Sequence, residues 1–347
     1  MRRLITLLLA TFVALFMTVG TTLACGGLIG PNGAVNLLRT TTFAGYHDGV
    51  EHYVTAFEFA GGGGAFGSLI PLPGVPSDVV KGGDWTLQRL VRETTPQRRD
   101  ALNVFAAAAS ADSAEVLMER QIDALDITVL KGGADQVGTW AKDHGFRLPP
   151  DAPEVLDFYA KRSPIFLAAA FDPTRAAARG QAIGDGTPVH ITIPTTNPWV
   201  PLRILALGKN GQERVDADVF LLTDRKPALL PSTDTPGLQL AHSAAATDLL
   251  LSDLRSDKGM DWVPSSAWLT KVAVGAQASS LQYDLAIDAS GQDAPSRVAA
   301  GFAPPDLPAA TPADVARLIL GLAVILLGVL FIVGLTAWRP AQGSLSR

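Results

Sequence analysis

The chain has 347 residues, with 28 Lys and Arg against 33 Asp and Glu, for a formal net charge of -5. A chain with a net negative charge lacks the basic footprint that binds a nucleic-acid backbone, so we do not expect a DNA- or RNA-binding protein. The single cysteine excludes an intramolecular disulfide and a zinc site made of several thiolates. Only 18% of the residues are charged, whereas soluble domains carry about 25%, and the apolar excess lies at the two ends of the chain.

The first 24 residues have the pattern of a secretory signal peptide. Arg2 and Arg3 precede an uncharged apolar run from Leu4 to Val19. Small side chains at Thr22 and Ala24 then stand at the -3 and -1 positions of a cleavage after Ala24. The stretch up to Ala24 is also long enough to cross a bilayer, so an uncleaved anchor is the alternative.

Cleavage after Ala24 makes Cys25, the only cysteine, the first residue of the mature chain. A cysteine in this position is the residue to which bacterial lipoproteins attach their lipid. Cys25 is therefore a lipidation candidate, although Thr22 stands where the lipoprotein signal usually has leucine. An unmodified cysteine is the alternative.

The C-terminal end predicts a single transmembrane helix. Leu318 to Trp338 is a run of 21 uncharged residues, of which 14 are Leu, Ile, Val or Phe. Each such side chain contributes about -0.3 to -0.6 kcal/mol to membrane insertion, so insertion is favoured. Trp338 and Arg339 end the span as interfacial residues do. We expect a signal peptide, an extracytoplasmic domain, a Pro/Ala-rich stalk, a transmembrane helix and a cytoplasmic tail, over residues 1–24, 25–288, 289–316, 317–338 and 339–347.

The middle of the chain predicts an α+β domain with a largely antiparallel sheet. Apolar and polar residues alternate over Ala34 to Phe43 and Tyr53 to Phe59, and Asp48-Gly49 between them favours a tight hairpin turn. Helical spacing follows around residues 84–91, 102–109, 137–144 and 151–159. Further runs typical of strands cover residues 66–72, 122–130, 165–171, 189–193, 202–207, 215–223, 268–274 and 281–287. Strands in succession with helices grouped between them are typical of this class.

Several short stretches of this domain resemble a known family. They are Ala24-Cys25-Gly26-Gly27, the hairpin, Ile70 to Gly74, Leu125 to Leu130, Trp140, Gly145-Phe146, Tyr159 to Phe166, Trp199 to Gly208 and Trp268 to Lys271. Together they resemble the bacterial exported family DUF2330, a domain of unknown function. The resemblance implies an envelope-facing domain that is often anchored in a membrane. It brings no activity and no catalytic residues with it.

Motifs that carry chemistry are scarce. The sequence has no Gly-x-Ser-x-Gly elbow of a serine hydrolase and no His-Glu-x-x-His motif of a zinc peptidase. One constellation stands out at the hairpin tip, where a two-residue turn at Asp48-Gly49 places His47 and His52 on one face, roughly 7 to 8 Å apart. A metal ion could bridge them with a carboxylate. Solvated polar side chains at a hairpin tip are the competing interpretation, and we predict no cofactor.

The sequence therefore favours a binding or interaction module at the bacterial cell envelope, with a protein or an envelope polymer as its partner. It predicts a single-pass membrane protein with the bulk of the chain outside the cytoplasm. The alternative is a membrane-tethered envelope hydrolase whose site is assembled from distant residues. A deep cleft with converging carboxylates or a Ser-His pair would favour the hydrolase, and a shallow surface would favour the binding module.

Overall fold

The computed structural model describes residues 27–31, 33–34, 40–57, 65–95, 116–180, 187–302 and 328. Residues up to Ala303 form one compact unit, and Pro304–Arg347 form a second. The predicted signal peptide, Cys25, the predicted helix at 102–109 and all of Leu318 to Trp338 except Gly328 lie outside the described residues. Among the residues that are described, no helix has the length and apolar character needed to span a membrane.

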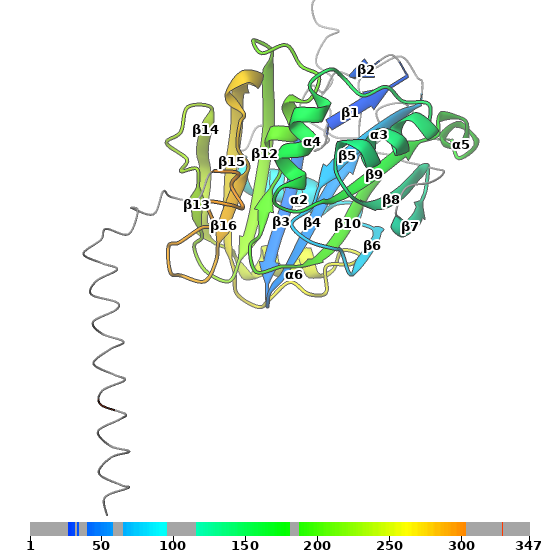
Figure 1. The fold of residues 1–347 in the computed structure, drawn as a ribbon. Coiled ribbons are helices and arrows are strands. Elements are labelled where there is room, and N and C mark those ends of the chain that lie inside the picture. The colour runs from blue at the N-terminus through cyan, green and yellow to red at the C-terminus, as the bar shows by residue number, and fades with distance from the viewer. Residues whose placement is uncertain are drawn as a thin grey trace, which may run out of the picture. The chain divides into compact units, whose positions relative to one another are not determined.

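Two large sheets and one small sheet build the first unit (Figure 1). The six-stranded sheet has the order β2 (Gly33–Ala34), β1 (Gly27–Gly30), β5 (Phe66–Pro71), β9 (Ile165–Phe171), β8 (Leu125–Lys131) and β7 (Val116–Ile122). The seven-stranded sheet has the order β14 (Leu238–Ala245), β15 (Trp268–Gln277), β12 (Arg214–Thr223), β3 (Thr40–His47), β4 (Val50–Phe57), β10 (Thr187–Pro194) and β6 (Asp78–Lys81). The three-stranded sheet joins β11 (Trp199–Val200), β16 (Leu285–Asp288) and β13 (Ala228–Leu230).

The described residues hold five α-helices and two short 3₁₀ helices. These are α2 (Thr86–Thr94), α3 (Ala134–Asp143), α4 (Ala152–Ala160), α5 (Pro173–Ala178), α6 (Asp248–Arg255), η1 (Arg203–Ala206) and η2 (Ala278–Ser280). Among the described strands, β3 and β12 form the one parallel pair and the others pair antiparallel. The predicted α+β class with a largely antiparallel sheet is therefore confirmed.

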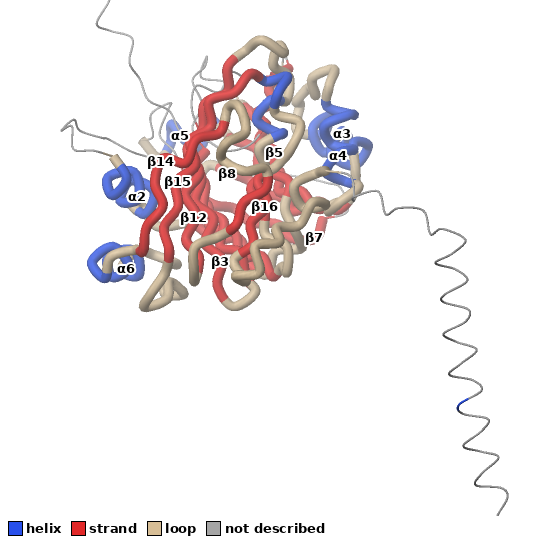
Figure 2. Tube along the Cα trace, turned by 90° about the vertical axis from the view of Figure 1, so that its left-hand side faces the viewer, coloured by secondary structure: helices blue, strands red, loops and turns tan. Residues whose placement is uncertain are grey.

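The seven-stranded sheet is covered on both faces. One face contributes Tyr53 and Val219 to a large core shared with Leu69 of β5 and Trp140 of α3. The other face buries a second cluster that includes Phe43, and it packs under α2 and α6, which lie side by side (Figure 2). Each fully buried aliphatic or aromatic side chain contributes roughly 1.5 to 3 kcal/mol, so these two clusters fix the sheet in place.

The predicted hairpin forms with the predicted register. Asp48 and Gly49 have φ of 48° and 78°, as a tight turn with two left-handed residues requires. His47 pairs with Val50, and Gly45 pairs with His52. The turn that joins β3 to β4 is therefore encoded locally.

Three predicted strands are wrong in detail, and the one over residues 281–287 is a strand only from Leu285, where β16 begins. Residues 122–130 do not form one strand, because Asp123 adopts a left-handed φ of 55° and turns the chain between β7 and β8. Within residues 202–207, Arg203–Ala206 form η1 rather than a strand. The N–H groups of Leu202 and Arg203 donate to the carboxylate of Asp284, which removes them from any sheet ladder.

The predicted stalk begins too early. Ala299 and Ala300 are buried, and the N–H of Asp284 donates to the carbonyl of Ala300 at 3.0 Å. The compact unit continues to Ala303. Residues 289–302 are therefore part of the domain rather than of an extended linker.

Candidate functional site

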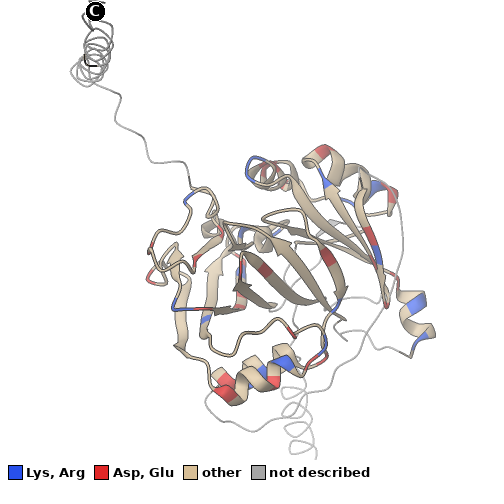
Figure 3. Cartoon of the chain, turned by 90° about the horizontal axis from the view of Figure 1, so that it is seen from below, with Lys and Arg blue, Asp and Glu red and all other residues tan. Residues whose placement is uncertain are grey.

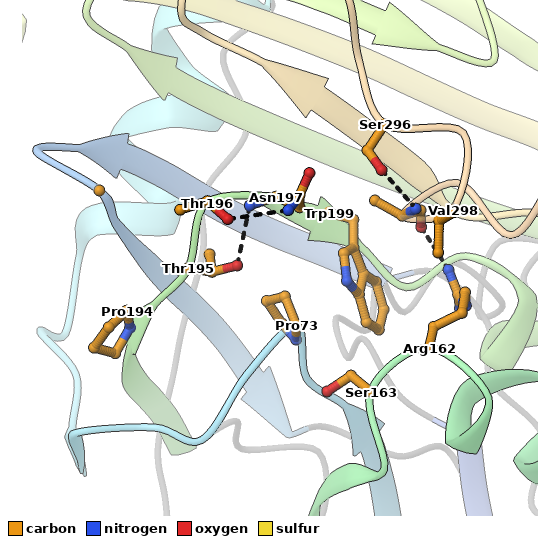
Figure 4. A pocket seen from close by; sticks show the side chains of 12 residues that line it. Pro73, Arg162, Ser163, Pro194, Thr195, Thr196, Asn197, Trp199, Ser296 and Val298 are labelled. Carbon is orange, nitrogen blue, oxygen red and sulfur yellow. Dashed lines mark hydrogen bonds between the residues drawn. The ribbon is translucent and has the colours of Figure 1, made fainter. Parts of the chain in front are cut away.

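A cavity of about 630 Å³ opens where five segments of the first unit meet (Figure 4). These are the β3–β4 turn, the loop after β5, the connection from α4 to β9, the β10–β11 loop and the segment before residue 300. They contribute Gly49, Pro73, Arg162, Ser163, Pro194, Thr195, Thr196, Asn197, Trp199, Ser296, Val298 and Ala299. We refer to this cavity as the rim pocket.

The β10–β11 loop forms one side of the rim pocket and is held by hydrogen bonds to the β3–β4 hairpin and within itself. The hydroxyl of Tyr46 donates to the carbonyl of Thr195 at 3.0 Å, and the N–H of Thr195 donates to the carbonyl of Gly49 at 3.0 Å. The N–H of Asn197 donates to the Thr195 hydroxyl, as Figure 4 shows. Thr196 and Asn197 are exposed, so this fixed loop presents polar side chains to solvent.

The opposite wall of the rim pocket rests on a buried ion pair. Arg162 Nη2 lies 2.5 Å from Asp284 Oδ2, with the two side chains 7% and 0% exposed. Arg162 Nη1 also donates to the carbonyl of Ala299. Burial raises the pKa of Asp284, and the neighbouring Arg162 guanidinium opposes this rise. The guanidinium lies 4.7 Å from the centre of the Trp199 ring, so the indole is packed rather than open to a ligand.

A second buried carboxyl lies behind Trp199. Glu51 is fully buried, and its Oε2 accepts a hydrogen bond from the N–H of Trp199 at 3.2 Å. Its Oε1 has no hydrogen-bond partner among the described residues. Burial raises the pKa of Glu51 to about 8, and the hydrogen bond from Trp199 opposes this rise. Glu51 is therefore protonated at neutral pH and adds no charge to the pocket.

The described lining of the rim pocket is poor in ionisable side chains. Among the described lining residues, Arg162 is the one ionisable side chain, and it pairs with Asp284. No histidine and no carboxylate stand among its described lining residues, and the carboxyls of Glu51 and Asp284 are fully buried. The described lining offers hydroxyl, amide and backbone groups to solvent, with the exposed Val298 as an apolar side chain beside them. Acidic and basic side chains are also interspersed over the described elements rather than gathered by sign (Figure 3).

The two histidines of the hairpin tip lie on one face of the sheet, but each has a different partner. His47 Nδ1 lies 2.7 Å from Asp224 Oδ1, and His52 Nδ1 lies 3.0 Å from Nε2 of His190. No group of three or more His, Cys, Asp or Glu side chains suited to a metal occurs in the described part of the chain. The metal role of His47 and His52 stays a prediction, as does the lipidation of Cys25, because Ala24 and Cys25 lie outside the described residues.

The residues of the rim pocket were not identified from the sequence. Arg162 and Asp284 are 122 positions apart, and no local motif announces their pairing. A signal was present for Glu51, because the alternation of β4 turns this carboxyl toward the same face as the buried Tyr53. A charged residue at an inward position of a strand is a candidate for a functional or buried polar site.

Comparisons with known proteins identify the family of this chain but assign it no function. No curated protein matches the sequence. Among solved structures, baculovirus P35 gives a TM-score of 0.38 at 10% identity, covering 74% of this chain and 97% of that chain. A mutated baculovirus P35 after caspase cleavage gives a TM-score of 0.36 at 8% identity, covering 74% and 98%. Likenesses at this level carry no argument.

The comparison with protein families gives a match over most of the chain. Residues 19–288 match a bacterial family, and this match spans the described domain from β1 to the end of β16. It also agrees with the resemblance noted from the sequence. The chain therefore belongs to the family described as "Uncharacterized protein conserved in bacteria (DUF2330)".

Proposed function

We propose that this protein is a binding module of the bacterial cell envelope. In this proposal the signal peptide exports the chain, the helix over Leu318 to Trp338 anchors it, and residues 339–347 stay in the cytoplasm. The extracytoplasmic domain binds a protein or an envelope polymer. The support for export and anchoring is the sequence pattern at the two ends.

The observation that carries the binding role is the chemistry of the rim pocket. A ligand there meets the side chains of Thr196, Asn197 and Ser296, with Pro73 and Val298 as apolar patches beside them. Such a surface forms hydrogen bonds with a neutral polar ligand and excludes water from its apolar parts. Among the described lining residues no group is poised to move a proton, since Arg162 is held by Asp284.

The hydrolase remains the second candidate because Ser163 lies in the same pocket. A nucleophilic serine needs a base within hydrogen-bond reach. No histidine belongs to the pocket lining in the part of the chain that the structure describes. The two nearby carboxyls, Glu51 and Asp284, are fully buried. The geometry therefore favours binding over hydrolysis.

Position-resolved crosslinking in living cells tests this proposal. A photoreactive amino acid replaces Thr196 at the pocket, or the exposed Lys142 on α3 as a control, in the full chain. We expect a discrete adduct from position 196 and none from position 142. Equal adducts from both positions, or none from position 196, would contradict a specific site there. Cleavage of an envelope polymer that is lost in Ser163→Ala would replace the binding role with the hydrolase.

A further inference from the structure

A pair of buried histidines lies on the other face of the seven-stranded sheet, away from Glu51. His52 of β4 and His190 of β10 belong to neighbouring antiparallel strands. Nδ1 of His52 lies 3.0 Å from Nε2 of His190, and the two residues are 9% and 4% exposed. Nδ1 of His190 is buried and has no partner among the described residues. The pair is therefore short of hydrogen-bond partners, which is costly for a buried ring.

An aromatic ring covers this pair. The indole of Trp262 stacks on the ring of His52 with the centres 3.9 Å apart and the planes 3° from parallel. Gly45, which lies opposite His52 in the β3–β4 ladder, leaves the room for it. A Cβ at Gly45 would lie 2.0 Å from Cη2 of Trp262. The glycine therefore allows the indole to lie flat over the sheet beside the two histidines.

The loop that carries Trp262 is anchored at its start. The carboxylate of Asp257 accepts hydrogen bonds from the N–H and the hydroxyl of Thr86, at 2.8 and 2.7 Å, and so caps α2. Gly259 has a φ of 78°, and a Cβ on it would lie 3.2 Å from Nδ1 of His190. The hydrogen bonds of Asp257 fix the start of the loop, and Gly259 passes close to the His190 ring. The site is thus formed from two strands and one loop that are far apart in the sequence.

Both imidazoles are neutral at pH 7. Burial lowers the pKa of His52 to about 3, and the neighbouring His190 adds to this effect. Burial likewise lowers the pKa of His190 to about 4, and the charge of Asp78 opposes this fall. A neutral imidazole keeps one ring nitrogen free to bind a metal ion.

We propose that His52 Nδ1 and His190 Nε2 bind one soft monovalent metal ion, Cu⁺ or Ag⁺, in place of the hydrogen that the two nitrogens share. One ring moves this hydrogen to its outer nitrogen, so that both rings stay neutral and no proton is released. Metal–imidazole bonds are about 2 Å long, so a linear ion separates the two nitrogens by roughly 4 Å, about 1 Å more than in the metal-free pair. This inference does not depend on the rim pocket or on its ligand.

The choice of a monovalent ion follows from the ligand set and the burial. Zinc takes four ligands, and no third His, Cys, Asp or Glu completes a set around this pair in the described residues. A Cu⁺ or Ag⁺ ion is satisfied by two nitrogen ligands. A single positive charge also costs less to bury than a double one. The face of Trp262 stabilises a cation near His52 through its ring quadrupole.

Ring nitrogen chemical shifts test the site directly. The full chain carries Cys25→Ser, which removes the only thiol that would compete for the ion, and ¹⁵N-labelled histidine. Silver nitrate is added at pH 7 in chloride-free detergent buffer. We expect one equivalent of Ag⁺ to shift His52 Nδ1 and His190 Nε2 and to leave His47, His144 and His242 unmoved. The inference is overturned if His52 and His190 stay unmoved or if only the other rings respond.

Two variants of the site, one control variant and a second metal complete the test. His52→Gln and His190→Gln each lose the one-equivalent site, whereas His242→Gln, on the exposed edge strand β14, keeps it. If His52→Gln or His190→Gln fails to fold, the Ag⁺ titration of the chain that keeps both histidines decides alone. Zn²⁺ is titrated in parallel. Binding of Zn²⁺ to the same rings as tightly as Ag⁺ would contradict the monovalent class.

Discussion

Among the described residues, Arg162 is the one charged side chain paired with the buried Asp284. The ion pair is almost fully desolvated, so removal of one partner leaves an uncompensated charge in the core. Arg162→Met should lower the free energy of unfolding by about 3 to 5 kcal/mol in urea titrations. Lys161→Met is the matched control, because Lys161 is 74% exposed and pairs with Asp157 on the surface of α4. We expect its cost to stay below about 0.5 kcal/mol, and equal losses in the two variants would contradict the role of the buried pair.

Glu51 gives the domain a pH dependence of known sign. Its pKa is raised from 4.5 to about 8, so the folded state holds this proton over a range in which the unfolded chain has lost it. Its contribution to stability is complete below pH 4.5 and is lost as the pH rises toward 8, by at most about 1.4 kcal/mol per pH unit. Glu51→Gln cannot ionise and still accepts the N–H of Trp199.

Urea titrations at pH 5 and pH 8 measure this effect of Glu51. The stability of the Glu51→Gln variant relative to the wild type should rise by roughly 3 kcal/mol between the two pH values. Glu154→Gln serves as the control, since the Glu154 side chain is 76% exposed on α4. A pH profile of Glu51→Gln that runs parallel to the wild type would show that Glu51 ionises normally in the folded protein.

The sequence predicts the placement of His47 and His52 but not the contact of His52 with His190. Alternation around Asp48-Gly49 places His47 and His52 on one face, as predicted, because the hairpin is a local structure. The contact of His52 with His190 spans 138 positions. It depends on β10 lying beside β4, and no motif near either residue encodes that pairing.

At the scale of elements, the packing of the Trp262 indole against Gly45 of β3 can be tested by a single substitution. Gly45→Ala adds a methyl group where the indole lies, so Trp262 must leave its stack on His52. We expect a loss of about 1 to 3 kcal/mol in the free energy of unfolding. The His52 ring protons should also lose the shift that the indole imposes on them.

A helical glycine provides the control for this change. Gly138 lies inside α3, and an added Cβ would meet only Cδ1 of Leu148 at 3.8 Å. Gly138→Ala should therefore raise the free energy of unfolding by up to about 1 kcal/mol. If the His52 ring shifts are unchanged in Gly45→Ala, the Trp262 indole does not stack on His52 in solution.

Elements with their own periodicity were predictable, and elements governed by distant side chains were not. The apolar run of β9 and the spacing of Val137, Trp140 and Ala141 in α3 identify these elements from the sequence alone. The segment over 202–207 has the composition of a strand, yet Asp284 takes its first N–H groups and the hydroxyl of Tyr159 accepts the N–H of Ile204. Its conformation is set by residues from two other segments.

At the scale of the whole molecule, the order of the strands is the least predictable feature. β12 lies parallel to β3 although about 170 residues separate them along the chain, and this pairing completes the seven-stranded sheet. The sheet then carries the rim pocket at one end of the β3–β4 hairpin and the histidine pair on its opposite face. The topology of the fold therefore creates both sites, whereas the two ends of the chain decide the proposed location.

Cysteine labelling in intact cells tests the central claim most directly, because it reports export and pocket occupancy together. Asn197→Cys at the rim pocket and Lys142→Cys on α3 are each made in the Cys25→Ser chain and treated with a maleimide that does not cross the cytoplasmic membrane. Lys142→Cys should react equally fast in cells and in purified protein. Asn197→Cys should react at least tenfold more slowly in cells, where a partner covers it. Equal rates for Asn197→Cys in both settings, or no labelling of either residue before the cells are opened, would contradict an exported domain that binds through this pocket.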